Sequence, residues 1–80
     1  MSVQNANDFI ELVEKNDEFR LKCYESSTIE ELMIMLNANG IAFSSNDFEN
    51  AINMKLVRCQ TYEQADVVKD IENWFKLFTL

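Results

Sequence analysis

The stretch Leu36-Asn37-Ala38-Asn39-Gly40-Ile41-Ala42-Phe43-Ser44 decides the fold of this chain. An apolar helical run stops at Gly40, the only glycine, and a serine, Ser44, stands where the next helix would begin. Glycine just past a helix end adopts the left-handed conformation that closes the last turn, and an apolar residue beyond it packs back. Ile41 and Phe43 are residues of that kind. The stretch predicts short helices separated by caps, with structural roles for Gly40, Phe43 and Ser44.

Length and composition favour a single helical domain. Eighty residues leave no room for a second core. A chain of this size buries about 60% of its unfolded surface on folding, which is enough for a small core. The hydrophobic fraction is 48%, and there is no proline, which favours helices over a turn-rich β architecture. We predict an all-α fold, a small single-domain bundle of four to five short helices over residues 1–80.

The charge balance is acidic. Fourteen Asp and Glu residues face seven Lys and Arg residues, for a formal net charge of −7. Such a surface repels phosphate backbones and anionic lipid headgroups, so nucleic acid and membrane surfaces are poor partners. The simplest interpretation is a solvated acidic surface that keeps a small domain dispersed. No apolar run approaches the ~20 residues that a membrane span needs.

Apolar periodicity predicts the first two helices. Ser2 is expected to cap a helix over residues 3–15, whose apolar positions recur at helical spacing. Asn16 is expected to end that helix and to cap a short second one, with Phe19 and Cys23 facing inward. The stripe of the first helix consists of Ala6, Phe9, Ile10 and Val13.

Capping signals place the next two helices. The third helix is predicted to begin at Ser27, or at Thr28 one residue later, because each stands three residues before a glutamate. The fourth helix is predicted to begin after Ser44 and to end near residues 54–56. Residues 55–60 are then the expected connector to the last helix.

The third helix carries more apolar surface than one face requires. Its five consecutive apolar residues, Leu32 to Leu36, place it centrally in the core or reserve part of it for a partner. Ile34 and Met35 extend the apolar surface around the helix, and Leu77 lies near the C-terminus. These three residues are the candidate partner-binding surface.

The C-terminal segment 61–78 reads as an additional amphipathic helix. Thr61 with Gln64 forms a capping signal at its start. Its apolar residues cluster within about a third of a turn on a helical wheel, and Trp74 is expected to be structural. We expect Val67, Ile71, Trp74 and Phe78 to pack on the other helices, beside Val68 and Phe75.

Catalytic and metal-binding chemistry is poorly supplied. The chain has no histidine, and Cys23 and Cys59 are far apart in sequence. Two distant cysteines do not make a structural zinc site, and one glycine does not make a phosphate loop. We therefore expect no enzyme activity, no cofactor and no metal. With no signal peptide evident, we expect a cytoplasmic protein with two free thiols.

The order of these features resembles the nitrogen-fixation-associated leader-peptide domain family of the Nif-eleven type. The resemblance covers about residues 1–54, the family-like helical core, and is a pattern of spaced positions. The matching residues are Met1-Ser2-Val3, Ala6, Phe9, Ile10, Val13, Asp17 to Lys22, Ser27 to Glu31, Gly40 to Ser44, Asp47-Phe48 and Ala51. The resemblance implies a small helical domain. Some members have no assigned activity, and in others a maturation enzyme grips the domain as the leader of a modified peptide.

The chain departs from the leader pattern in its last third. No glycine follows residue 54, so the small-residue cleavage pair of the family is missing, and an amphipathic segment stands in place of a core peptide. We therefore expect a free-standing, non-enzymatic protein-interaction module that docks on an unidentified protein. One alternative is a leader-containing precursor of a ribosomally made modified peptide, with residues 55–80 as substrate. Another is an acidic decoy that binds a basic protein.

Overall fold

Five helices make up the computed structural model, which describes residues 2–79. They are α1 (Val3–Lys15), α2 (Asp17–Glu25), α3 (Ile29–Ala38), α4 (Ser45–Arg58) and α5 (Tyr62–Thr79). Within residues 2–79 there is no strand, so the all-α prediction is confirmed. Met1 and Leu80, the ends of the predicted domain, lie outside the described residues.

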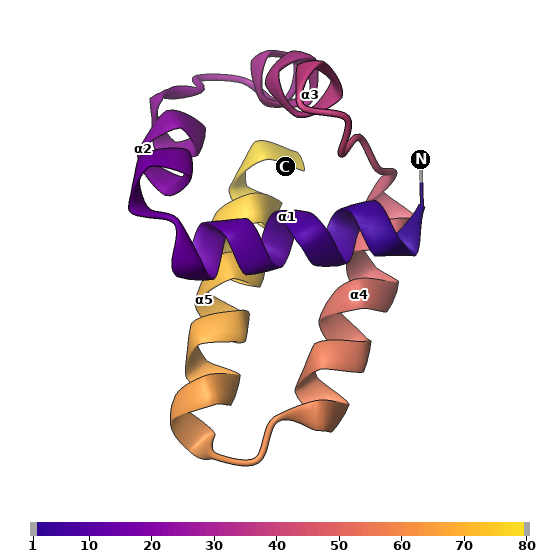
Figure 1. Ribbon diagram of the computed structural model, residues 1–80, viewed down its shortest axis with the longest axis vertical. Coiled ribbons are helices and arrows are strands. Elements are labelled where there is room, and N and C mark those ends of the chain that lie inside the picture. Colours follow the sequence, from indigo (N-terminus) through magenta and orange to yellow (C-terminus); the bar gives the residue numbers. More distant parts are fainter. Residues whose placement is uncertain (1, 80) are drawn as a thin grey trace.

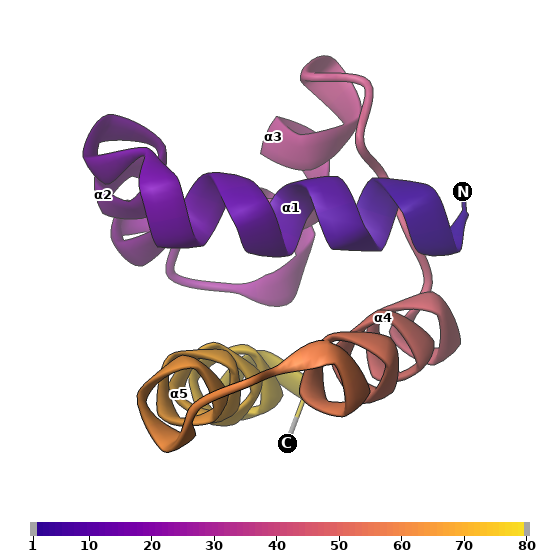
Figure 2. The same cartoon turned by 60° about the horizontal axis from the view of Figure 1, so that its bottom comes forward.

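Helix α1 packs against three of the other four helices. It packs closely against α2, α4 and α5, and α4 packs against α5 as an antiparallel hairpin (Figure 1). In the turned view the hairpin lies on one side of α1 and α3 on the other (Figure 2). The segment between α3 and α4 is tied to α1 by the Asn5 side-chain amide, which donates to the carbonyl of Ala42 at 2.9 Å.

The predicted caps are observed at both ends of α1 and at the start of α4. The Ser2 hydroxyl accepts from the Asn5 backbone N–H at 3.0 Å. Asn16 ends α1 and caps α2, as its position predicted. Ser44 and Asp47 exchange side-chain and backbone hydrogen bonds, both 3.1 Å, in a capping box. Each bond satisfies a backbone donor that the first helical turn leaves unpaired.

Of the two caps predicted for α3, Thr28 is the one that forms. Its hydroxyl accepts from the backbone N–H of Glu31 at 3.2 Å, so the alternative with Ser27 as N-cap is wrong. Ser27 still takes part, because its backbone N–H donates to the Glu31 carboxylate at 2.8 Å. Helix α5 begins with the same pair of bonds. The Thr61 hydroxyl accepts from the backbone N–H of Gln64, and the Gln64 side chain accepts from the backbone N–H of Gln60, the residue before the cap.

Gly40 closes α3 in the predicted left-handed conformation, with φ of 73°. Its N–H donates to the carbonyl of Asn37, and the N–H of Ile41 donates to that of Leu36, each at 3.0 Å. This pair of bonds defines a Schellman motif. Leu36 is buried and Ile41 packs against the core, which supplies the apolar contact that accompanies the motif.

The core is an aromatic cluster centred on Phe9 of α1. Its ring lies 5.1 Å from Phe43, centroid to centroid, and 6.0 Å from Phe75. Phe43, predicted from the sequence to be structural, is therefore buried where the segment after Gly40 meets α1 and α5. The buried residues are Ala6, Phe9, Ile10, Val13, Cys23, Leu32, Leu36, Phe43, Phe48, Ala51, Ile52, Val68, Ile71 and Phe75.

Helix α5 contributes to this core through a face slightly different from the predicted one. Val68, Ile71 and Phe75 are buried, and Trp74 is half-buried with its ring stacked 6.2 Å from that of Phe9. Val67 was expected to pack inward, but 46% of it is exposed. Successive helical residues are about 100° apart, so burying Val68 turns Val67 to the edge of the interface.

The fourth helix is longer than predicted. It continues to Arg58, so residues 55–60 are not the connector and only residues 59–61 join α4 to α5. Leu56 packs against the core in this extra turn. Lys55 and Arg58 stand in the last turn, where cations interact favourably with the negative end of the helix dipole.

Candidate functional site

The hairpin of α4 and α5 extends past α1 (Figure 1). A hollow lies between these three helices and is lined by residues of each of them. This hollow, called here the main groove, has a volume of about 580 Å³. That volume falls within the ~300–1,000 Å³ of typical ligand sites. The groove is lined by Asn7, Glu11, Glu14, Lys15, Met54, Lys55, Arg58, Cys59, Gln64, Val67 and Val68.

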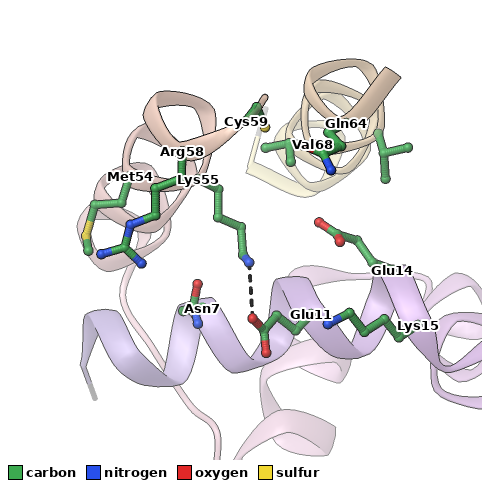
Figure 3. Close-up of a pocket in the computed structure, with 11 residues that line it drawn as sticks. Asn7, Glu11, Glu14, Lys15, Met54, Lys55, Arg58, Cys59, Gln64 and Val68 are labelled. Carbon is green, nitrogen blue, oxygen red and sulfur yellow. Dashed lines mark hydrogen bonds and ion pairs between the residues drawn. The ribbon is translucent and has the colours of Figure 1, made fainter. Parts of the chain in front are cut away.

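Charges of both signs face one another across the main groove (Figure 3). The ammonium group of Lys55 on α4 lies 3.4 Å from the carboxylate of Glu11 on α1, and its side chain is only 17% exposed. This ion pair links the hairpin to α1 across the hollow. Lys15 and Arg58 make no ion pair with other described residues.

The groove is locally basic on an acidic molecule. It collects three of the seven Lys and Arg residues of the chain but only two of its fourteen acids. Apolar side chains from α4 and α5 stand among these charges, namely Met54, Val67 and Val68. Mixed apolar and charged linings of this kind are typical of protein-contact surfaces, where an apolar centre is surrounded by polar groups.

The two cysteines occupy different environments and both are free thiols, as predicted. Cys23 on α2 is fully buried, and burial raises the pKa of its thiol to about 12 because the thiolate loses its hydration. Cys59, at the end of α4, is half-buried and lines the main groove. Only Cys59 is therefore accessible to a reagent from solution.

A second hollow, called here the side pocket, opens between α1, α2 and α5. Its volume is about 220 Å³, and it shares Glu14 and Val67 with the main groove, so the two hollows are contiguous. The Tyr24 and Trp74 rings in its wall meet edge to face, with centroids 5.3 Å apart. The side pocket is lined by Val13, Glu14, Arg20, Tyr24, Val67, Asp70, Ile71 and Trp74.

The side pocket carries two carboxylates that have no partner among residues 2–79. Neither Glu14 nor Asp70 makes a hydrogen bond or an ion pair with another described side chain. Arg20 also lines the pocket, but its guanidinium is hydrogen-bonded to the carboxylate of Asp17 on its own helix. The Arg20 charge is thereby balanced, and the pocket has a net negative character.

The residues proposed from the sequence as a partner surface do not gather at either hollow. Ile34 and Leu77 are each 71% exposed, whereas Met35 is half-buried and packs against the core. Helices α3 and α5 are not among the closely packed pairs. Ile34 and Leu77 are thus exposed apolar side chains on two different helices.

Sequence reasoning missed both hollows for a geometric reason. The sequence predicts a connector at Lys55 and Arg58 and a core position for Val67. The available signal was the pair Val67-Val68, since two adjacent apolar residues in an amphipathic helix cannot both face the centre of one interface.

Among residues 2–79 there is no group of three or more side chains arranged to hold a metal ion. In the same part of the chain no helix combines the length and apolar character required to cross a membrane. Comparison of the sequence with models of protein families, with curated proteins and with solved structures gives no match.

Proposed function

We propose that this chain is a non-enzymatic protein-interaction module that docks on a larger protein through the main groove. The observation that carries the proposal is the lining of this groove, where Met54, Val67 and Val68 stand among charges of both signs. An amphipathic helix laid in such a groove is a common recognition mode, with apolar anchors at helical spacing and polar groups at the edges. The resemblance to leader-like helical domains, which larger enzymes grip, supports the same class of function.

The folded state of α5 argues for this function over that of a peptide precursor. A maturation enzyme needs its substrate segment extended and accessible. Val68, Ile71 and Phe75 are buried, and each such side chain stabilises the fold by roughly 1.5–3 kcal/mol. Presenting residues 55–80 as substrate would require the loss of these contacts.

The distribution of charge argues against an acidic decoy as the main role. A decoy presents acidic groups over its contact surface, in the way that nucleic acid presents phosphates. The main groove instead gathers Lys15, Lys55 and Arg58. A partner at the main groove therefore meets a surface of mixed charge.

The experiment is affinity capture from lysate of the native host with matched variants of the tagged chain. Val67→Arg fills the junction of the two hollows with a long charged side chain. Val57→Arg is the control, because Val57 is 86% exposed on α4 and lines neither hollow. We expect a specific partner to be lost with Val67→Arg and retained with Val57→Arg, while both variants melt like the parent chain.

Two further variants test the surface predicted from the sequence. Ile34→Arg and Leu77→Arg should leave capture unchanged if the main groove is the contact. If these variants lose the partner and Val67→Arg keeps it, the apolar edge of α3 with Leu77 is the docking surface. If no variant affects a saturable complex, the main-groove proposal is wrong.

A further inference from the structure

The side pocket has the size of a single side chain. Its volume of about 220 Å³ corresponds to about seven water molecules at ~30 Å³ each. That is less than a cofactor or a drug-sized ligand needs. The pocket also opens onto the main groove through Glu14 and Val67, so a residue of a segment lying in the groove could reach it.

The walls of the side pocket combine two groups that attract cations. The first is the aromatic pair Tyr24 and Trp74, whose rings meet edge to face at 5.3 Å. The face of a tryptophan or tyrosine ring carries negative potential and attracts ammonium and guanidinium groups. Tyr24 is 54% exposed, so part of this aromatic surface is open to a ligand.

The second group of the side pocket that attracts cations is a pair of carboxylates, which come from different helices. Glu14 lies on α1 and Asp70 on α5, and neither has a partner among the described side chains. The one cation of the lining, Arg20, is held by Asp17. A second cation in the pocket would therefore meet uncompensated negative charge.

We infer that the side pocket binds an arginine side chain of the docked partner, with the guanidinium against Trp74 and Tyr24 and its N–H groups directed to Glu14 and Asp70. This inference rests on the proposed function, since the rest of the partner segment occupies the main groove. Arginine fits better than lysine because its planar guanidinium stacks on aromatic rings and presents five donors in a fixed geometry. Two carboxylates from two helices match that set of donors.

The main groove specifies the neighbouring part of the same segment. Lys15 and Arg58 line the groove and lack ion-pair partners within residues 2–79. An acidic residue of the partner segment forms the ion pair that these two side chains lack. The segment therefore carries an arginine anchor and an acidic residue on one apolar face, and a uniformly basic segment is a poorer match.

The probe that tests the pocket is a blocked five-residue peptide with arginine at its centre and alanine elsewhere. Its control is the same peptide with citrulline, which keeps the shape of arginine and removes the charge. Binding is read from the indole N–H signal of Trp74 in a heteronuclear NMR titration, which is unambiguous because the chain has one tryptophan. A lysine peptide is the third probe.

Matched variants separate the pocket from the general acidity of the protein. Asp70→Asn and Glu14→Gln each remove one proposed carboxylate. Asp66→Asn and Glu18→Gln remove the same charge from exposed positions outside both hollows. We expect Asp70→Asn and Glu14→Gln each to weaken binding of the arginine peptide about tenfold, the effect of losing a hydrogen bond to a charged group. The two control variants should bind like the parent chain.

Any of three results would overturn the inference. The arginine and citrulline peptides could bind equally well, all four variants could lose the same affinity for the arginine peptide, or the Trp74 signal could fail to shift. Stronger binding of the lysine peptide would reject arginine as the specific anchor. Tyr24→Leu removes aromatic surface without altering charge and should also weaken binding of the arginine peptide. Because the peptides test the pocket without the partner, failure here leaves the main-groove result with Val67→Arg unaffected, and the converse also holds.

Discussion

The ring of Phe48 on α4 stacks on the ring of Phe75 on α5, with centroids 4.1 Å apart and planes inclined by 25°. Phe9 of α1 lies within 6.3 Å of both rings, so three helices meet at one aromatic contact. Aromatic pairs contribute about 0.5–1.5 kcal/mol beyond the area they bury. This contact joins the two helices of the hairpin to each other and to α1, the three helices that line the main groove.

Phe75→Ala should therefore be severely destabilising. Truncation of a buried phenylalanine costs about 3–5 kcal/mol, which is a large share of the roughly 5–15 kcal/mol available to a small domain. Leu77→Ala, two residues along α5, is the control, because Leu77 is 71% exposed and should change the free energy of unfolding by less than about 0.5 kcal/mol. Urea denaturation followed by circular dichroism measures both. If both substitutions lowered the free energy of unfolding equally, the assignment of Phe75 to the buried face of α5 and of Leu77 to its exposed face would be wrong.

Substitution of Gly40 should reveal the cost of its backbone conformation alone. Its φ of 73° is unfavourable for residues with a β-carbon, and a β-carbon built there meets no atom within 4 Å. Gly40→Ala should cost about 1–2 kcal/mol, the penalty of the left-handed conformation, and Gly40→Val at least as much. Gly40→Asn should cost less, because asparagine tolerates this region. A neutral Gly40→Val would show that α3 ends by another means.

Local chemistry made much of this fold predictable from the sequence. Asn16 was recognised as the end of one helix and the cap of the next because the capping bond spans three residues. Gly40 was recognised for a similar reason, since its Schellman bonds reach back no further than Leu36. The apolar stripe of α1, including Phe9, is buried as its period predicted.

The hollows could not be predicted because they depend on how distant segments cross. The Glu11–Lys55 ion pair joins residues 44 positions apart, and nothing near Lys55 in sequence indicates that α4 continues past residue 56. The adjacent pair Val67-Val68 indicates that one of the two lies away from the centre of the interface. Which of them lies at the edge follows from the rotation of α5 against α1, which tertiary packing decides. The candidate site predicted on α3 rested on apolar excess alone, and the structure places Met35 of that set against the core.

The two thiols should differ in reactivity and in their effect on stability at high pH. Burial raises the pKa of Cys23 from 9.0 to about 12, so in this range the folded state holds a proton that the unfolded state releases. Stability from this group is complete below pH 9 and is lost as the pH rises toward 12. The difference in stability between the parent chain and Cys23→Ala should shrink over that interval. An aromatic disulfide reagent at pH 8 should modify Cys59 and leave Cys23 untouched until the protein unfolds.

Deleting residues 59–80 should abolish the cooperative melt. The deletion removes Val68, Ile71 and Phe75 from the core and exposes the rings of Phe9 and Phe48 that they cover. If α5 is part of the core, adding a synthetic peptide of residues 59–80 should restore the helical signal and the cooperative transition of the truncated chain. Trp74 in that peptide should shift its emission to shorter wavelength on binding, because it becomes half-buried beside Phe9 and Phe78. A truncated chain that melts cooperatively on its own, with an emission of Trp74 in the full chain typical of free water, would instead identify α5 as a detachable segment and restore the leader-and-substrate hypothesis.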